Sequence, residues 1–283
     1  MSRAWRIRDG EIPLGGRTVL MGIVNVTPDS FSDGGRYHTE GTAVAHGLEL
    51  EREGAHILDV GGESTRPGAQ PVSSDEEIRR VVPVVRRLAQ QGAVVSIDTR
   101  RARVAKEALD AGARIVNDVT AGRDPAMFRV VAEADAGLVL MHMQGEPGSM
   151  QQAPHYTDVA KEVASFLAER AHAAQLAGVA RESIALDPGL GFGKTLGHNL
   201  ELLRRLPEIG ALGFPLLVGA SRKSFLGTLT ARDANVPSPQ DRVEASVGAH
   251  LAAVAKGADI VRVHDVRAHQ RAFAVADHVL RSG

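Results

Sequence analysis

The sequence contains no cysteine, which excludes disulfides, thiolate metal sites and a cysteine nucleophile. It also has no excess of charge of either sign, because 33 Lys and Arg residues balance 34 Asp and Glu residues, for a formal net charge of −1. A balance this even argues against nucleic acid or an anionic membrane as a partner, so an anionic ligand must be held locally. The missing thiols fit a reducing compartment, and we expect a cytoplasmic protein.

Long hydrophobic runs are also missing. The first residues, 1–6, lack the apolar core of a secretory signal, and the longest apolar stretch, around residues 211–220, is far shorter than the ~18 residues that a membrane span needs. With 43% hydrophobic and 24% charged residues over 283 positions, the composition is typical of a globular protein. We therefore expect a protein that is neither exported nor embedded in a membrane.

A repeated unit runs through the chain, in which short β-branched runs alternate with Ala-rich segments of helical periodicity. Residues 53–59, 111–117 and 256–262 each contain a Gly-Ala pair, then a polar residue and two apolar ones. A glycine that can adopt left-handed backbone is typical of a helix end, and the apolar residues after it are typical of a buried strand. The chain therefore repeats one helix-to-strand unit.

Eight apolar runs are predicted to form strands, with helical segments between them. An unbroken series of eight such units favours an α/β fold of the closed type, a single (β/α)8 TIM barrel. The alternative is an open doubly wound sheet, but no GxGxxG follows the first strand. We expect one domain over residues 1–283, with an N-terminal β-hairpin (1–17) at the barrel bottom and long loops after the first two strands. The predicted strands are 18–25, 56–61, 93–98, 114–119, 137–143, 184–188, 215–220 and 259–264.

Polar residues stand at nearly every carboxyl end of these strands, where a barrel carries its active site. A strand end can be polar simply because it meets water. However, Asp98, Asn117 and Asp187 end runs that should bury them, and a buried carboxylate is costly unless it is hydrogen-bonded. Two carboxylates and an amide suit a flat heterocycle with clustered N–H donors, such as a 2-amino-4-oxopyrimidine ring. A purine or another pyrimidine would also satisfy this pattern.

The last strand ends in two residues suited to an anion. Arg262 and His264 are two positions apart, so their side chains point to the same side, next to Asn25 on the first strand. The loops after the last two strands of such barrels often bind phosphate, and Arg offers a bidentate fork. A structural ion pair for Arg262 and a capped strand end for His264 are the alternatives.

Several motifs that would indicate other functions are incomplete or absent in this sequence. Residues 189–195 resemble a phosphate-binding loop, but residue 188 is Pro where a Walker A motif needs its first glycine. The motifs of zinc peptidases, serine hydrolases and EF-hands are absent from the sequence. The long loops 26–37 and 61–68 are either surface loops or lids that close over a substrate.

Both long loops carry motifs that resemble the two signatures of the dihydropteroate synthases, a family of pterin-binding enzymes. These motifs are Asn-Val-Thr-Pro-Asp-Ser-Phe-Ser-Asp-Gly-Gly at 25–35 and Gly-Gly-Glu-Ser-Thr-Arg-Pro-Gly at 61–68. The resemblance continues in order from residue 22 to 266, which is nearly the whole chain. Its further blocks are 96–99, 116–119, 141–145, 187–189, 191–194, 221–224 and 262–265.

The resemblance implies a transferase that joins (7,8-dihydropterin-6-yl)methyl diphosphate to 4-aminobenzoate, giving 7,8-dihydropteroate and pyrophosphate in folate biosynthesis. It implies Mg²⁺ as the cofactor, small molecules as substrates and a homodimer. The implied pterin-binding residues are Asp98, Asn117, Asp187 and Lys223. The implied diphosphate-binding residues are Asn25, Thr65, Arg66, Arg262 and His264, of which Asn25 would also bind the metal. Pro67, Phe192 and Ser224 would line the 4-aminobenzoate pocket.

We expect the C–O bond to the diphosphate to break before the amine attacks, because the electron-rich dihydropterin delocalises the resulting cation. Arg66, Arg262 and His264 would stabilise the departing pyrophosphate, and Asp33 in the first long loop would help to shield the cation from water. The residues expected to be catalytic are Asp33, Arg66, Lys223, Arg262 and His264. A non-catalytic pterin-binding paralogue and a pterin-dependent methyltransferase are the alternatives, although the latter has no use for residues that bind diphosphate.

Overall fold

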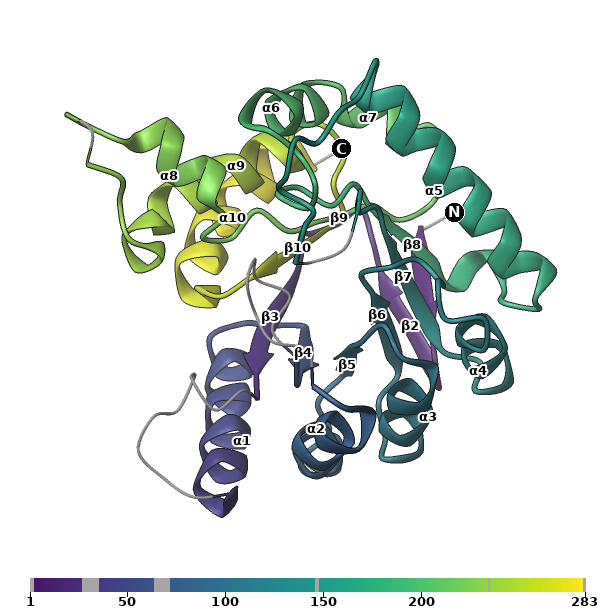
Figure 1. The fold of residues 1–283 in the computed structure, drawn as a ribbon. Helices are drawn as coiled ribbons and strands as arrows, with labels where there is room; N and C mark the ends of the chain where they lie inside the picture. The colour runs from purple at the N-terminus through teal and green to yellow at the C-terminus, as the bar shows by residue number, and fades with distance from the viewer. Residues whose placement is uncertain (1–2, 27–35, 64–71, 146–147, 234, 282–283) are drawn as a thin grey trace.

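The computed structural model describes residues 3–26, 36–63, 72–145, 148–233 and 235–281. Eight parallel strands form one sheet in the order β8-β7-β6-β5-β4-β3-β10-β9. The last strand of the chain, β10, lies beside β3, the first strand of this sheet in the sequence (Figure 1). The bounds of the strands are β3 Val19–Asn25, β4 Ile57–Gly61, β5 Val95–Asp98, β6 Ile115–Asp118, β7 Gly137–Met141, β8 Ile184–Asp187, β9 Leu217–Val218 and β10 Ile260–Val263.

The sheet closes on itself between its two end strands. Leu186 of β8 forms a parallel bridge with Leu216, and the Leu186 amide donates to the carbonyl of Pro215 over 2.9 Å. The predicted (β/α)8 TIM barrel is thereby confirmed. The strand β9 is shorter than the predicted run 215–220, in part because Pro215 has no amide hydrogen to donate to a neighbouring strand.

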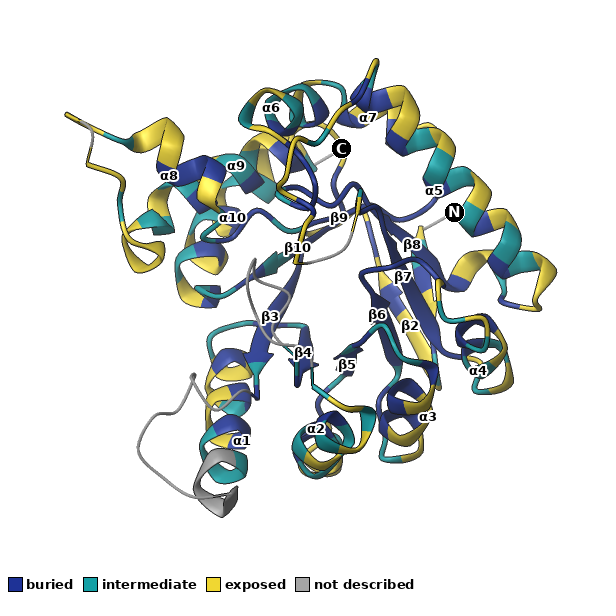
Figure 2. Cartoon of the chain, in the orientation of Figure 1, coloured by how far each residue is buried: buried dark blue, intermediate teal, exposed yellow. Residues whose placement is uncertain are grey.

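Helices lie outside the ring of strands, and Figure 2 shows mostly buried barrel strands in the middle, surrounded by helices whose outer faces are exposed. The helix α2 illustrates why one face of each helix is buried. Val81, Val85 and Leu88 recur at helical spacing on one face and are buried, and Ser73 caps the first turn. The bounds are α1 Arg36–Arg52, α2 Ser74–Gln90, α3 Ala102–Asp110, α4 Met127–Glu133, α5 Val159–Leu176, α6 Leu196–Arg204, α7 Leu206–Gly210, α8 Ser224–Thr230, α9 Val243–Val254 and α10 Val266–Leu280, with short 3-10 turns at Arg181–Ser183 and Pro239–Arg242.

The predicted N-terminal hairpin is also present. Strands β1 (Ala4–Ile7) and β2 (Gly10–Pro13) pair antiparallel, with Trp5 opposite Ile12. Trp5 is fully buried, and its indole N–H donates to the carbonyl of Ser183 over 2.9 Å. Trp5 and Ile12 join a hydrophobic cluster with the first residues of several barrel strands. The hairpin therefore closes the amino-terminal end of the barrel and leaves the other end for the site.

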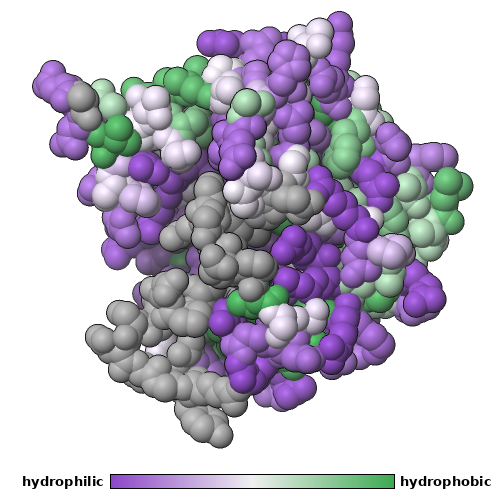
Figure 3. All heavy atoms as spheres, viewed as in Figure 1, coloured by the Kyte–Doolittle hydropathy of each residue, from purple (hydrophilic) through white to green (hydrophobic). Residues whose placement is uncertain are grey.

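The surface offers little sign of a broad apolar face on the side shown in Figure 3, where hydrophilic residues cover most of the described area and hydrophobic ones form small groups. None of the helices described by the structure combines the length and the apolar character needed to cross a bilayer. The expectation that residues 1–283 form a single domain stays a prediction.

Candidate active site

Four neighbouring strands bring polar or small residues into one row at the carboxyl end of the barrel. In the sheet register, Asn25 of β3 pairs with Gly61 of β4, Gly61 with Asp98 of β5, and Asp98 with Asn117 of β6. The side chain of Asp98 lies directly beside Gly61, since a Cβ on that glycine would be 3.4 Å from the Asp98 Cβ. The row therefore concentrates a carboxylate and two amides on one short arc of the rim.

An arginine on β10, the strand next to β3, reaches into this arc. The guanidinium of Arg262, on β10, donates from Nε to Oδ2 of Asp59 over 2.6 Å and from Nη2 to Oδ2 of Asp98 over 2.7 Å. The same Asp59 oxygen accepts from Nδ2 of Asn117 over 2.9 Å. Because a carboxylate can only accept, Asp59 fixes the orientation of the Asn117 amide and turns its carbonyl oxygen away from Asp59.

Burial raises the pKa of the two carboxyl groups that the sequence predicts to bind the ring. The pKa of Asp98 is raised to about 7 by burial, against the opposing charge of Arg262. The pKa of Asp187 is raised to about 6, again by burial, although Oδ1 accepts a hydrogen bond from the Gly189 amide over 2.7 Å and Lys223 lies nearby. Carboxyl groups poised near neutral pH are typical of functional sites.

Lys223 enters the same region from the loop after β9. Its Nζ lies 3.8 Å from the centroid of the Phe192 ring, which is a cation–π contact. Its alkyl chain passes Gly191, where φ is +80° and a Cβ would lie 3.1 Å from the Lys223 Cδ. A side chain at 191 would thus meet both backbone strain and the lysine. The contact joins the loops that follow β8 and β9.

A second lysine, Lys194, is buried beneath this region. Its Nζ donates to the carbonyl of Phe192 over 3.0 Å and lies 2.9 Å from Nδ1 of His142. Burial lowers the pKa of Lys194 to about 7, and the pKa of His142 falls to about 3 through burial and the neighbouring Lys194. Lys194 therefore holds the loop after β8 against the end of β7.

The loops after β9 and β10 are bound to each other. The backbone amide of His264 donates to Oγ of Ser221 over 3.1 Å, and Nδ1 of the same imidazole lies 3.0 Å from that hydroxyl. Arg222 forms a bidentate pair with Asp265, with N–O distances of 3.0 and 2.6 Å. Ser224 is the first residue of the helix α8. Lys223 and His264 are thus carried on mutually braced segments.

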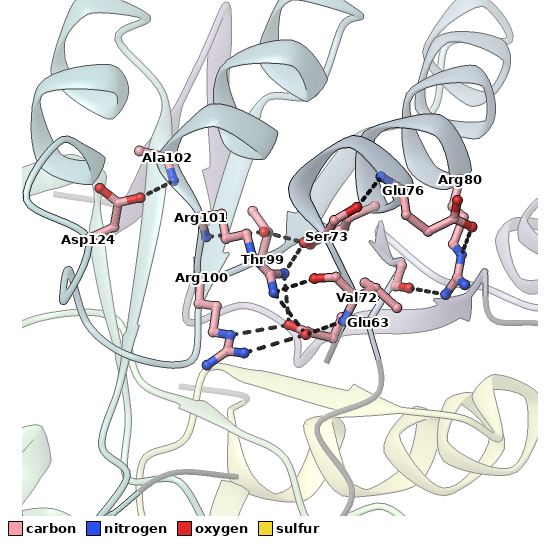
Figure 4. A network of polar contacts seen from close by, with 12 residues as sticks. Glu63, Val72, Ser73, Glu76, Arg80, Thr99, Arg100, Arg101, Ala102 and Asp124 are labelled. Carbon is pink, nitrogen blue, oxygen red and sulfur yellow. Dashed lines mark hydrogen bonds and ion pairs between the residues drawn. The ribbon is translucent and has the colours of Figure 1, made fainter. Parts of the chain in front are cut away.

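Figure 4 shows a polar network at the two residues that flank 64–71. The guanidinium of Arg101 contacts the Glu63 carboxylate at 2.9 and 3.0 Å and donates to the carbonyl of Val72 over 2.8 Å. It also pairs with Glu77, which is fully buried. The Glu63 carboxylate accepts in turn from the Val72 amide, so Arg101 holds both Glu63 and Val72 at the start of α3.

Most of the residues predicted for the site lie at this end of the barrel, although their roles toward a substrate stay predictions. The structure resolves one alternative, because Arg262 does form the ion pairs that the sequence left open. The predicted residues that the structure describes are Asn25, Asp98, Asn117, Asp187, Phe192, Lys223, Ser224, Arg262 and His264. The predicted residues Asp33, Thr65, Arg66 and Pro67 lie outside the described ranges.

Two residues of the site were missed by the sequence reasoning. Asp59 interrupts a buried strand, and a charged residue inside such a run was a signal that it has partners. Lys194 follows a glycine-rich stretch, but nothing in its spacing indicated that the loop folds back and buries the ammonium group against His142.

Comparisons with known proteins agree with this geometry. A family model described as Pterin binding enzyme matches residues 21–264. A curated dihydropteroate synthase from Neisseria meningitidis serogroup C is 53% identical over 253 residues, which is 88% of each chain. Dihydropteroate synthase from Xanthomonas albilineans, solved with 4-aminobenzoic acid, superimposes with a TM-score of 0.91 at 48% identity and covers 99% of this chain and 98% of its own. A structure of the Xanthomonas albilineans enzyme with 7,8-dihydropteroate gives a TM-score of 0.87 at 45% identity, with 98% of each chain covered.

Proposed function

This chain belongs to the dihydropteroate synthase family of pterin binding enzymes, and we propose how its residues carry out the reaction of that family. The chain is a transferase that joins (7,8-dihydropterin-6-yl)methyl diphosphate to 4-aminobenzoate, with dihydropteroate and pyrophosphate as products. The observation that supports our assignment of roles is the cluster of Asp98, Asn117 and Asp187 beside Lys223, because it offers acceptors and a cation to one flat ring.

The pterin ring is held by this cluster. An ionised carboxylate accepts two N–H bonds, so Asp187 matches the 2-amino group and the adjacent ring N–H of a pterin. The amide of Gly189 holds one Asp187 oxygen in place. Asp59 accepts from the Asn117 amide group, so the carbonyl oxygen of Asn117 is left to accept from an N–H group of the pterin. Lys223 donates to the ring oxygen or a ring nitrogen from its position over Phe192.

The diphosphate is held at the arc formed by Asn25, Arg262 and His264. If the Ser221 hydroxyl donates to Nδ1 of His264, the proton of that ring resides on Nε2, which then offers a donor to a phosphate oxygen. Arg262 carries its charge into the same arc, and ion pairing with Asp59 and Asp98 raises its pKa further, against its burial. Thr65 and Arg66, which lie outside the described ranges, would add two further side chains that bind the diphosphate.

The donor set at β3 also fits Mg²⁺. Asn25 supplies one neutral oxygen at a strand end, and the described residues contain no cluster of three carboxylate or imidazole groups that could hold a metal alone. Mg²⁺ prefers oxygen ligands and keeps several waters, so Asn25 would hold an ion whose other ligands are diphosphate oxygens and water. When bound, the ion would neutralise charge on the leaving pyrophosphate.

4-Aminobenzoate is placed against Phe192 and Ser224, on the side where Lys223 approaches. Its aryl amine is already a neutral nucleophile, so no strong general base is required. We propose that the C–O bond breaks first and the amine attacks the delocalised cation second. Pro67 would line the same 4-aminobenzoate pocket, and Asp33 would help to shield the cation from water.

Pyrophosphate release tests the function. The purified protein is mixed with the dihydropterin diphosphate, Mg²⁺ and 4-aminobenzoate, and each component is omitted in turn. Release that needs all three, with dihydropteroate formed in equal amount, is the expected result. Pterin binding without release would instead indicate a non-catalytic paralogue. Positional isotope exchange within the diphosphate in the absence of the amine would support cleavage before attack.

We also propose a homodimer and a cytoplasmic location, the latter in keeping with a cysteine-free sequence. The dimer proposal is supported by exposed apolar residues on α10, where Val275 and Val279 are 68% and 76% exposed. Sedimentation equilibrium at micromolar concentration should give twice the chain mass. V275E combined with V279E should yield the monomer, and an unchanged dimer would show that another surface is used.

A further inference from the structure

Two histidines that play no part in the roles above lie buried behind the β9 and β10 loops. His250 comes from α9 and His269 from α10, and neither is exposed. The Nδ1 of His250 lies 2.9 Å from Nε2 of His269, with the two ring planes 59° apart. The pair therefore forms a direct contact between the two helices that support the last two strands of the barrel.

The hydrogen bonds on either side fix where the protons sit. The backbone amide of Ala220 donates to Nε2 of His250 over 2.9 Å, so that nitrogen carries no proton. A neutral ring then has its proton on Nδ1, which donates to Nε2 of His269. The proton of the second ring must accordingly be on Nδ1, and this nitrogen lies 2.7 Å from the carbonyl oxygen of Asp265. Every contact in the chain then has one donor and one acceptor.

Adding a proton to either ring breaks this order. A doubly protonated His250 would turn Nε2–H against the amide of Ala220. A doubly protonated His269 would turn Nε2–H against Nδ1–H of His250. Each case sets two hydrogens against each other in a buried place, where unsatisfied polar groups are costly. With both rings neutral, every contact therefore has one donor and one acceptor only when both are Nδ1–H tautomers.

We propose that His250 and His269 are positioning residues, a tautomer-locked pair that holds the loop after β9 (219–223) at a fixed distance from the loop after β10 (264–265). The first loop carries Lys223 and the second carries His264. The inference rests on the proposed function, in which Lys223 binds the pterin and His264 binds the diphosphate. The pair acts from below, while Ser221–His264 and Arg222–Asp265 connect the same loops at the rim.

The charged and titratable groups that face the pair are consistent with neutral rings. Burial lowers the pKa of His250 well below its ordinary value, and His269 and His264 lower it further. Burial also lowers the pKa of His269, although the backbone carbonyls of Asp265 and Ser246 and the carboxylate of Asp265 act in the opposite direction. That carboxylate is itself paired with Arg222.

The tautomers are tested by nuclear magnetic resonance on the full chain labelled with ¹⁵N-histidine. Signals are assigned with H250Q and H269Q. At pH 7 we expect both rings to show a protonated Nδ1 and an unprotonated Nε2. A proton on Nε2 of either ring at pH 7 would overturn the proposal. This measurement needs no substrate, so its outcome is independent of whether the chain turns over.

The positioning role is tested with H269F, which keeps the size of the ring and removes both nitrogens. The net value of one or two hydrogen bonds corresponds to roughly a 3- to 10-fold rise in KM for the dihydropterin diphosphate, and we expect kcat to change by less than about 2-fold. The variant H269Q, which retains a donor and an acceptor, should recover part of the loss. H172F, at an exposed position on α5, is the matched control. A lower melting temperature with unchanged KM in H269F would show a structural role only and refute positioning.

Discussion

The Nε of Arg262 lies 2.6 Å from Oδ2 of Asp59, a carboxylate that is fully buried inside the barrel. The second oxygen of Asp59 has no hydrogen-bond partner within the described part of the chain. Asp59 thus orients Arg262 and Asn117, two residues that contact the substrate in the proposed function. A buried carboxylate in this position therefore orients two residues of the proposed site at once.

Asp59→Asn is expected to weaken both the fold and the site. The substitution keeps the shape but removes one of the two carboxylates that Arg262 faces. Because Asp98 remains as a partner, we expect a loss of unfolding free energy below the about 3–5 kcal/mol that a fully broken buried ion pair costs. Urea denaturation measures the loss, and calorimetry with a pterin measures the affinity. Asp135→Asn, which breaks the exposed pair with Arg6, is the control and should cost less than about 1 kcal/mol. Equal stability of the two variants would contradict the role of Asp59.

Asp187→Asn is expected to weaken pterin binding by about 1.5–3 kcal/mol, because it removes a charge-assisted acceptor. Isothermal titration with a free pterin gives the affinity directly. Asp110→Asn, which alters only the exposed pair with Lys106 at the end of α3, should bind as the unsubstituted protein does. An Asp187→Asn variant of unchanged affinity would remove Asp187 from the pterin site.

The pH dependence of binding follows from the same carboxyl group. Since the pKa of Asp187 is about 6 in the free protein, pterin affinity should fall as the pH is lowered through 6, by up to 10-fold per pH unit below it. In stability the sign is opposite: between the ordinary pKa near 3.8 and 6 the native state binds more protons, so burial of Asp187 lowers the unfolding free energy as the pH rises. Calorimetry from pH 5 to 8 should show this fall in affinity. Asp187→Asn should remove the part below pH 6 and leave the part due to Asp98, whose pKa is about 7.

Lys194→Met is expected to change how stability depends on alkaline pH. The pKa of Lys194 is about 7 when folded, below its ordinary value of 10.5, so the unfolded chain binds more protons between these values. The unfolding free energy therefore rises with pH in this window, by at most about 1.4 kcal/mol per unit. Urea denaturation at pH 7.0 and 8.5 should show the rise in the unsubstituted protein and in the exposed control Lys256→Met. Persistence of the full rise in Lys194→Met would assign it to another group.

Arg101→Lys is expected to impair the reaction although Arg101 is assigned no contact with substrate. A lysine has a single ammonium group and cannot bridge Glu63, Val72 and Glu77 at once. We expect KM for the dihydropterin diphosphate to rise by roughly 10-fold, equivalent to about 1.4 kcal/mol. Steady-state kinetics test this, with Arg103→Lys, in an exposed pair with Asp75, as the control. If both variants have the KM of the unsubstituted chain, the network of Arg101 with Glu63, Val72 and Glu77 has no influence on binding.

The barrel could be predicted because its signals are local. A Gly-Ala helix end followed by a continuous apolar run recurs along the chain, and β3 lies within one residue of its predicted bounds. Parallel strands of a barrel end on the same rim, so Asp98, Asn117 and Asp187 could be grouped from their positions alone. Asp59 could not, because its partner Arg262 is 203 residues away and their meeting depends on strand register.

The barrel is joined least firmly between β8 and β9, where the single bridge from Leu186 to Leu216 closes it. Asp187 lies on one side of this join and Lys223 on the other. A pterin held by both side chains would form a non-covalent crosslink between β8 and β9, where few backbone hydrogen bonds join the strands. The substrate would then also stabilise the closed barrel for as long as it is bound.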